Sequence, residues 1–207
     1  MDKVSIIVRT CGRPEVLRGA LESIRKQTYP DVETVVIEDG LEISRQMICT
    51  EYSDLQLRYI STGKRVGRAK AGNLGMKVAQ GKYLNFLDDD DVLYPEHIEI
   101  LLQTLQSAEE KAVYSVAEEA AAIYRKRKRT FYDVRKKVRF REPFNRMYLL
   151  HTNYLPIQSV MFEKSLFEQY GGFRENVDYL EDWDLWVRYA AHTNFKMVNE
   201  ITSMYRV

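Results

Sequence analysis

The sequence KYLNFLDDDDVLYP, residues 82–95, contains an apolar run that stops at four consecutive aspartates. The run, residues 83–87, has the length of a buried strand. Pro95 and Glu96 are typical of the first turn of a helix, because the apolar residues that follow them recur at helical spacing. A bare acidic tetrapeptide is usually a solvated loop, but open α/β sheets bind ligands at the carboxyl ends of their strands. We therefore expect the aspartates at 88–91 to lie in a ligand site.

Four carboxylates at the end of one strand repel one another unless positive charge lies close to them. A hard divalent cation with oxygen ligands, bound together with diphosphate oxygens, would neutralise such a cluster. The pattern therefore predicts a divalent metal, Mn²⁺ or Mg²⁺, at this strand end.

Apolar runs and helical patterns alternate along the first half of the chain. Predicted strands cover residues 4–8, 33–37, 57–60 and 83–87, and predicted helices cover residues 17–24, 66–80 and 96–105. This order predicts a doubly wound, mostly parallel α/β sheet flanked by helices. The second strand also ends in an acidic pair, Glu38 and Asp39, which such a sheet brings to the same edge as the aspartate run.

The second half of the chain is less regular. Predicted strands cover residues 112–117, 157–162, 195–198 and 204–207, and predicted helices precede Gly171 and span residues 180–191. Glu181 and Asp182 stand in the first turn of the last helix, where the helix dipole favours carboxylates. The final strand runs to the last residue without a polar tail, so we expect residues 1–207 to be one domain at the N-terminal part of a longer chain.

The composition is that of a globular protein, with 207 residues of which 45% are hydrophobic. Cys11 and Cys49 are the two cysteines and provide no disulfide framework, so we expect a reducing compartment. The sequence has neither a signal peptide nor an apolar run as long as a membrane span. These features predict a soluble, cytoplasmic protein.

The net charge of +1 conceals a strongly basic segment at residues 125–141, which holds ten Lys or Arg and one Asp. Without a counter-charge such a segment should be mobile. Two interpretations stay open: the segment gathers an anionic acceptor, as a peripheral contact with the inner membrane face or with an acidic glycan, or it is a solvated flap. Aromatic residues interleaved with the basic ones are thin support for nucleic-acid binding, which we do not expect.

Three stretches together resemble family 2 of the inverting glycosyltransferases, which have the GT-A fold. They are VSIIVRTCGRPEVLRGALESIRKQTYPDVETVVIEDG at 4–40, GRAKAGNLGMKVAQGKYLNFLDDDDVLYP at 67–95 and SVMFEKSLFEQYGGFRENVDYLEDWDLWVRYA at 159–190. Any one block would be a weak signal, but their order and spacing make the match specific. The resemblance implies a nucleotide-sugar-binding half over residues 1–110 and an acceptor half, with the catalytic base, over residues 111–207.

The same resemblance implies the reaction and the roles of individual residues. The reaction is metal-dependent, inverting transfer of a sugar from a nucleotide diphosphate sugar to a hydroxyl of a glycan or lipid-linked acceptor, as in cell-surface polysaccharide synthesis. The leaving group would be a UDP by family tendency, with thymidine and guanosine diphosphates as alternatives. Asp90 matches the metal ligand, Asp182 matches the catalytic base, and the implied donor-binding residues are Thr10, Arg13, Glu38, Asp39, Arg68, Asn73, Asp88 and Asp89.

The sequence departs from the family pattern at three positions. Arg9 stands where the family usually has proline, and Arg174 replaces an acidic residue. Gly72 stands where an arginine commonly precedes Asn73, so a diphosphate contact is missing there. Arg68, Arg65 or Lys70 could supply that charge instead.

Several residues have a structural interpretation beside the functional one. Asp91 is expected to cap the helix that follows it. Asp182 could be a simple helix N-terminal carboxylate. Trp183 and Trp186 could stack on a sugar or pack in the core. We interpret His97, His151 and His192 as structural or surface residues. A non-catalytic module that binds nucleotide sugars or anionic glycans is the alternative to the enzyme, but such a module would be expected to have lost Asp90 or Asp182.

Overall fold

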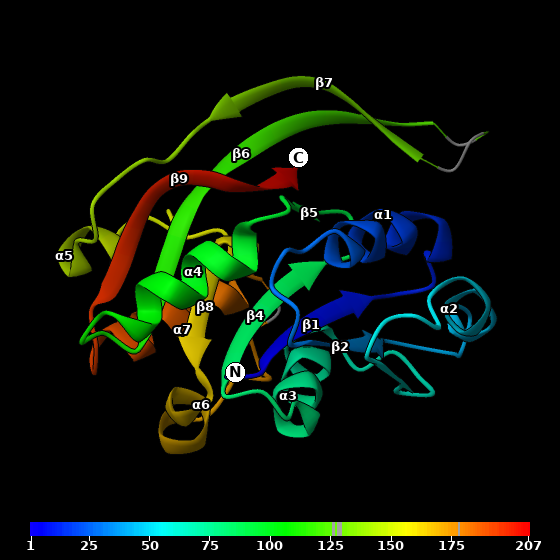
Figure 1. Cartoon of the computed structure of the whole chain (residues 1–207), viewed down its shortest axis with the longest axis horizontal. Helices are drawn as coiled ribbons and strands as arrows, with labels where there is room; N and C mark the ends of the chain where they lie inside the picture. Colours follow the sequence, from blue (N-terminus) through cyan, green and yellow to red (C-terminus); the bar gives the residue numbers. More distant parts are fainter. Residues whose placement is uncertain (126, 128–129, 178) are drawn as a thin grey trace.

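Four parallel strands form the first half of one curled sheet (Figure 1). The structure is a computed structural model and describes residues 1–125, 127, 130–177 and 179–207. The strands are β1 (Val4–Thr10), β2 (Val32–Glu38), β3 (Leu57–Ser61) and β4 (Tyr83–Asp88), in the order β3-β2-β1-β4. The connecting helices are α1 (Pro14–Arg25), α2 (Arg45–Glu51) and α3 (Arg68–Val78). This half confirms the predicted alternation. The sequence pattern missed α2, because only Met47 and Ile48 are buried in it.

The second half of the sheet is mixed rather than parallel. Strand β8 (Val160–Glu163) lies antiparallel between β4 and β6 (Ala112–Arg125), and β6 pairs in parallel with β9 (Phe195–Arg206). Strands β5 (Val92–Leu93) and β7 (Thr130–Val138) pair antiparallel with β9 and β6 respectively. The remaining helices are α4 (His97–Gln106), α5 (Arg146–Leu149), α6 (Lys164–Tyr170), α7 (Glu181–Ala190) and the 3₁₀ turn η1 (Ile157–Ser159).

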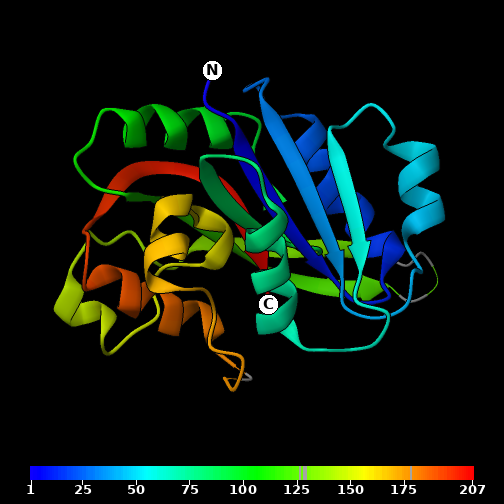
Figure 2. The ribbon, with the colours of Figure 1, turned by 90° about the horizontal axis from the view of Figure 1, so that it is seen from below.

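Helices cover both faces of the sheet and enclose two hydrophobic cores. Helices α1, α2 and α4 contribute apolar residues to one core, and α3, α6 and α7 contribute to the other. The second group lies together in front of the sheet in Figure 2. Trp186 of α7 is fully buried and makes edge contacts with the rings of Phe162 and Phe195, so it is a core residue and not a sugar platform.

Two expectations about the second half are wrong. The two late strands form one continuous strand, β9. Most of the basic segment is also ordered: residues 130–138 form β7, which pairs along β6 in an arm that extends past the body (Figure 1). Counter-charges explain this order, because Lys136 and Lys137 form ion pairs with Glu118 and Glu119. Residues 126, 128 and 129 of that segment lie outside the described residues.

The packing of α3 against the loop after α6 leaves no room for a side chain at Gly72. A Cβ atom at this position would lie 2.5 and 2.8 Å from two ring atoms of Phe173, which is itself buried. We expect Gly72→Ala to lower the free energy of unfolding by about 1–3 kcal/mol, as overpacking does in cores. Urea unfolding followed by circular dichroism measures this.

Gly19 of α1 provides the matched control, because a Cβ atom there has no neighbour within 4 Å. Gly19→Ala should stabilise the protein by roughly 0.4–1 kcal/mol, since alanine reduces the entropy of the unfolded chain. Equal stability of Gly72→Ala and the wild type would contradict the described packing of Phe173.

Candidate active site

The first two aspartates of the run each pair with an arginine. Asp88 is the register partner of Arg9 across β4 and β1, and Arg9 donates to both its oxygens, Nε to Oδ1 at 2.8 Å and Nη2 to Oδ2 at 3.0 Å. Asp89 accepts from Thr10 Oγ1 at 2.6 Å and from Arg13 Nε at 3.1 Å. The protein itself therefore supplies positive charge to the cluster, and a metal is not required to relieve the repulsion.

The last two aspartates of the run differ sharply in exposure. Asp91 is buried and accepts from the backbone N–H of Arg206 at 3.0 Å. It therefore does not cap α4, which begins six residues later at His97, and that prediction is wrong. The side chain of Asp90 is 29% exposed and lies 3.3 Å from Arg13 Nη1. Asp90 is thus the carboxylate of the run that is open to a ligand.

These different surroundings shift the pKa values of Asp88, Asp89 and Asp91 in different ways. Burial acts to raise the pKa of Asp88, but the Arg9 guanidinium overcomes it and lowers that pKa. Burial raises the pKa of Asp89 to about 6, against the effects of Arg13 and Thr10. Burial, with the charges of Asp88 and Asp90, raises the pKa of Asp91 well above its ordinary value.

Glu38 and Asp39, at the end of β2, organise the loops beside the aspartate run. Glu38 is fully buried and accepts from the backbone N–H groups of Gly12 and Ser44, at 3.0 and 2.9 Å, and from the Tyr59 hydroxyl at 2.6 Å. Both oxygens of Glu38 therefore hold the loops together, and its donor-binding role stays a prediction. Asp39 accepts from the backbone N–H groups of residues 66 and 67 at 2.6 and 3.0 Å.

A small cavity of about 60 Å³ lies at the carboxyl ends of β1, β2 and β4. Asp39 and Asp89 line it together with Thr10, Arg13 and Arg68, as the sequence predicts for a donor site. The cavity is also lined by Arg9, Cys11, Ala71 and Asp88. Both cysteines of the chain are free and exposed.

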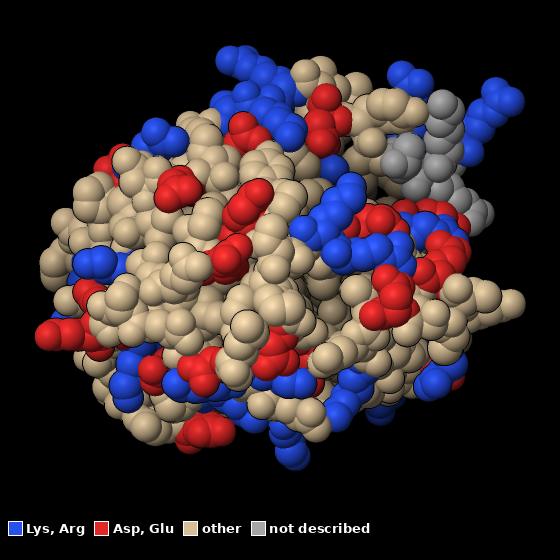
Figure 3. Space-filling view, in the orientation of Figure 1, with Lys and Arg blue, Asp and Glu red and all other residues tan. Residues whose placement is uncertain are grey.

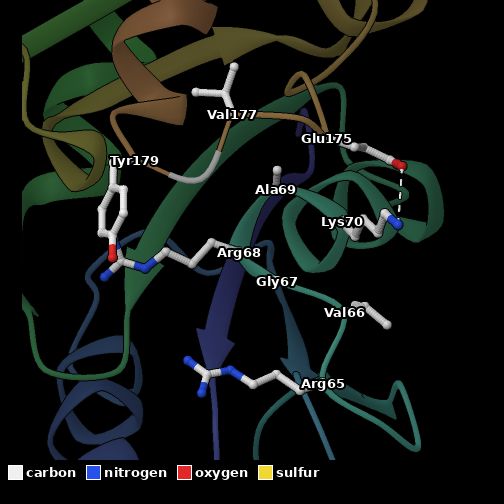
Figure 4. A pocket seen from close by; sticks show the side chains of 9 residues that line it. All are labelled: Arg65, Val66, Gly67, Arg68, Ala69, Lys70, Glu175, Val177 and Tyr179. Carbon is white, nitrogen blue, oxygen red and sulfur yellow. Dashed lines mark ion pairs between the residues drawn. The ribbon is translucent and has the colours of Figure 1, made fainter.

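A larger pocket of about 400 Å³ surrounds the start of α3 (Figure 4). Arg65 and Arg68 extend to the same side of this helix, whereas Lys70 points away and pairs with Glu175 at 3.9 Å. Gly67 precedes the helix with a φ of 98°, a conformation that glycine adopts without strain. Arg65 and Arg68 line this pocket and stay the predicted substitutes for the charge that is missing at Gly72. Arg68 also lines the two other cavities of the site.

Asn73, a predicted donor-binding residue, bonds to the loop that follows α6. Its Nδ2 donates to the Phe173 carbonyl at 2.9 Å, and its Oδ1 accepts from the Phe173 N–H at 2.8 Å. Both atoms of the amide are thus committed to the loop that leads to α7. Arg174, in the same loop, pairs with Asp184 at 3.1 Å instead of facing an acceptor.

The predicted metal ligand and the predicted base face one cavity. This cavity, of about 410 Å³, is lined by Asp88, Asp90 and Arg68 from the first half of the chain and by Asp182 and Asn153 from the second. Asp182 accepts from Asn153 Nδ2 at 3.1 Å and from the Trp183 N–H at 2.8 Å. Burial, together with the charge of Glu181, raises the pKa of Asp182, and the hydrogen bond from Asn153 acts against this.

The sequence analysis missed three residues that line this cavity: Asn153, Arg139 and Arg206. Arg206 donates to the backbone carbonyl of Asp90 and pairs with Asp133 at 2.8 Å, which joins the aspartate run to the basic arm. Arg139 was recognised only as part of the basic segment. A single asparagine in a loop and an arginine in the last strand carry no pattern that could have been read from the sequence.

The residues around Asp90 fit a divalent metal that arrives with a diphosphate. Among the described residues, no group of three or more His, Cys, Asp or Glu side chains is arranged to hold a metal ion. Asp90 is nevertheless a hard oxygen ligand, partly exposed at a roomy polar cavity. Mg²⁺ is commonly held by one or two carboxylates plus substrate phosphates, so one open carboxylate is a sufficient protein contribution.

Comparison with known proteins shows the family to which this chain belongs. The family model for glycosyl transferase family 2 matches residues 5–171, and the chain belongs to this family. Among curated relatives, the uncharacterised glycosyltransferase YwdF of Bacillus subtilis (strain 168) is 31% identical over 197 residues, which cover 95% of this chain and 71% of YwdF. The uncharacterised glycosyltransferase RP339 of Rickettsia prowazekii (strain Madrid E) is 28% identical over 99% of this chain and 64% of its own length.

Solved structures show the same fold. S. aureus TarS residues 1–349, in complex with UDP-GlcNAc, superpose with a TM-score of 0.81 at 17% identity, over 99% of this chain and 58% of that one. The mannosyltransferase PcManGT from Pyrobaculum calidifontis, with GDP-Man and Mn²⁺, superposes with a TM-score of 0.70 at 18% identity, over 99% of this chain and 56% of that one. This chain therefore spans less than two thirds of either solved chain.

The helices carry no sign of a membrane span. Within the part of the chain that the structure describes, no helix is both long enough and apolar enough to cross a bilayer.

Proposed function

We propose that this chain transfers a sugar from a nucleoside diphosphate sugar to an acceptor hydroxyl with inversion at the anomeric carbon. The observation that carries the proposal is the shared cavity, which Asp90 and Asp182 line from opposite halves of the chain. A donor whose diphosphate lies near Asp90 would present its sugar toward Asp182. An acceptor hydroxyl between the sugar and Asp182 would then attack from the face opposite the leaving group.

Asp182 is the general base of this proposal. Its raised pKa brings the carboxylate closer to the pKa that proton abstraction near neutral pH requires, and Asn153 orients it. Arg65, Arg68 and the N-terminus of α3 would stabilise the negative charge that develops on the departing diphosphate. A divalent metal at Asp90 would supply Lewis-acid stabilisation of the same charge.

We propose uracil as the base of the donor nucleotide, with thymine and guanine as alternatives. TarS was solved with UDP-GlcNAc and PcManGT with GDP-Man, so the fold accommodates both a pyrimidine and a purine in those proteins. Asp39 remains the proposed partner of the base or ribose, although two backbone N–H groups already bind its oxygens.

Release of nucleotide from UDP-sugars, with and without Mn²⁺, tests the proposal. A panel of UDP-, dTDP- and GDP-sugars in a thermal-shift assay selects the donor first. Metal-dependent release with an acceptor supports the enzyme. Binding to a nucleotide sugar without release under any acceptor condition would favour the alternative, a non-catalytic module that binds nucleotide sugars or anionic glycans.

We further propose that the β6–β7 arm gathers an anionic acceptor, such as a lipid-linked phosphate at a membrane surface or an acidic glycan. Basic side chains gather along the upper edge of Figure 3, over this arm, with acidic ones between them. The arm also exposes apolar side chains, with Ile123 at 58% and Val134 at 63%. Arg139, which directly follows β7, also lines the cavity that holds Asp182, so an anion at that end of the arm would lie near the proposed base.

Replacement of Arg125, Arg127 and Arg135 by serine should weaken binding to anionic vesicles by at least about tenfold, because each basic residue near such a bilayer contributes about 1 kcal/mol. Vesicle sedimentation with and without anionic lipid measures this. The control is Lys26, Lys77 and Lys196 changed to serine, which removes equal charge from exposed positions elsewhere. If both variants sediment like the wild type, the membrane version is wrong, and competition by an acidic polysaccharide decides the glycan version.

A further inference from the structure

Arg9 links the two halves of the site through a buried guanidinium. Its side chain is 6% exposed and lies near the end of β1. Two of its nitrogens bind Asp88 of β4, and the third, Nη1, donates to Glu181 Oε1 at 2.8 Å. Glu181 is the first residue of α7 and is itself 3% exposed. All three nitrogens of this guanidinium are therefore used inside the protein, on elements that are 79 and 172 residues away.

Aromatic rings enclose the same guanidinium. The Cζ atom of Arg9 lies 5.6 Å from the ring centroids of both Phe86 and Phe173. Phe173 also covers Gly72, where any side chain on α3 would collide with its ring. Phe173 thus packs against both α3 and the guanidinium that comes from β1.

The chain enters α7 through a strained residue. Leu180 has a φ of 58°, and it is the non-glycine residue with positive φ among the described residues. Such a conformation persists only where surrounding contacts hold it. The hydrogen bond from Arg9 to Glu181 is a buried contact that holds the first turn of α7 directly after this residue. Asp182, the proposed base, is the next residue along that turn.

We propose that Arg9 is a positioning residue for sugar transfer: through Glu181 it holds the first turn of α7, and with it Asp182, in place relative to the acidic end of β4. The inference rests on the proposed function. It adds the contact that holds the two halves of the site, one with the aspartate run and one with Asp182, in alignment. Although Arg9 also lines the small cavity at the strand ends, all three of its guanidinium nitrogens bind Asp88 or Glu181, so its effect on transfer passes through those residues. Its charge also pairs with two carboxylates, the partly exposed Asp88 and the buried Glu181.

Two substitutions at Glu181 separate the hydrogen bond from the charge. Glu181→Gln and Glu181→Met remove the same charge beside Asp182, but only glutamine keeps an oxygen that can accept from Arg9. We expect Glu181→Met to lower the transfer rate by at least about tenfold, because small misplacements of a reacting group have effects of this size. Glu181→Gln should stay within about threefold of the wild type. Both should bind UDP with the affinity of the wild type, because neither substitution changes a residue that lines the donor cavity.

Arg9→Met tests the other end of the contact. In the Glu181→Met background it should lower the transfer rate by much less than it does alone, because the bond between Arg9 and Glu181 is already absent there and only the bonds to Asp88 remain to be lost. Hydrogen exchange gives a readout that does not depend on activity: Arg9→Met and Glu181→Met should speed exchange of the Asp184 and Leu185 amides. Arg18→Met, which removes an exposed ion pair with Glu51, should change neither exchange nor transfer.

The outcomes distinguish the inference from the proposed function. Equal transfer rates in Glu181→Gln and Glu181→Met, or unchanged amide exchange in α7, overturn the positioning role even if the protein is an active transferase. Failure of the wild type to bind any nucleotide sugar overturns the proposed function, and amide exchange still decides whether Arg9 holds α7.

Discussion

Asp182→Asn is expected to lower the rate of sugar transfer by about 10²–10⁴-fold while donor binding stays near the wild-type value. The asparagine fits the same space: its one oxygen can still accept from the Trp183 N–H, and its Nδ2 can donate to Asn153 Oδ1 once that amide turns over, so the fold around it should persist. It cannot take a proton from the acceptor hydroxyl. Initial rates with acceptor, and UDP affinity by calorimetry, measure the two effects.

The pH dependence of the wild type gives a second readout of the same residue. Burial and the charge of Glu181 raise the pKa of Asp182, against Asn153 and Arg9. The base acts only when it is deprotonated, so transfer should fall as the pH drops through this raised pKa. The acid limb should therefore lie above the ordinary range of an aspartate, and it should disappear from the residual activity of Asp182→Asn.

Asp184→Asn is the matched control. Asp184 stands in the same first turn of α7 and pairs with Arg188 and Arg174, so its loss removes a helix-terminal carboxylate without touching the base. Transfer by this variant should stay within about threefold of the wild type. If Asp182→Asn lowers transfer by less than roughly fivefold, Asp182 is a helix-terminal carboxylate and not a base.

Asp90→Asn should weaken UDP binding in the presence of Mn²⁺ by at least about tenfold, or about 1.4 kcal/mol. The reason is that Asp90 is the open carboxylate of the run, with a side chain 29% exposed, so a metal there depends on few protein ligands. Without metal, the variant and the wild type should bind UDP alike, because the substitution then removes no ligand. Calorimetric titration with Mn²⁺ and with a chelator gives both values.

Asp54→Asn serves as the control for this series, since it removes an exposed carboxylate that pairs with Arg25 on the surface of the donor half. It should leave the metal dependence unchanged. An Asp90→Asn variant that responds to Mn²⁺ as strongly as the wild type would exclude Asp90 as the metal ligand.

Local patterns in the sequence determined the strands β1 to β4, the helices α1, α3 and α4, and the place of the acidic cluster. The apolar runs at β1, β2 and β4 are long enough to be buried on both faces, so their alternation with helices permits few arrangements other than a parallel sheet. Parallel strands end at one edge, and this brings Asp39 and Asp88 to the same side of the sheet. The arrangement of Asp90 and Asp182 around one cavity followed from the family resemblance and not from periodicity.

The partners of those residues were decided only by the tertiary structure. Arg9 meets Asp88 through strand register and meets Glu181 through the packing of α7, over separations that local sequence patterns do not encode. The same holds for Arg206 beside Asp90 and for Asn153 beside Asp182. The charges of the basic segment, taken alone, predict that its side chains repel one another and that the segment is mobile. Sheet pairing with β6 placed Glu118 and Glu119 against it, and those neighbours made β7 a strand.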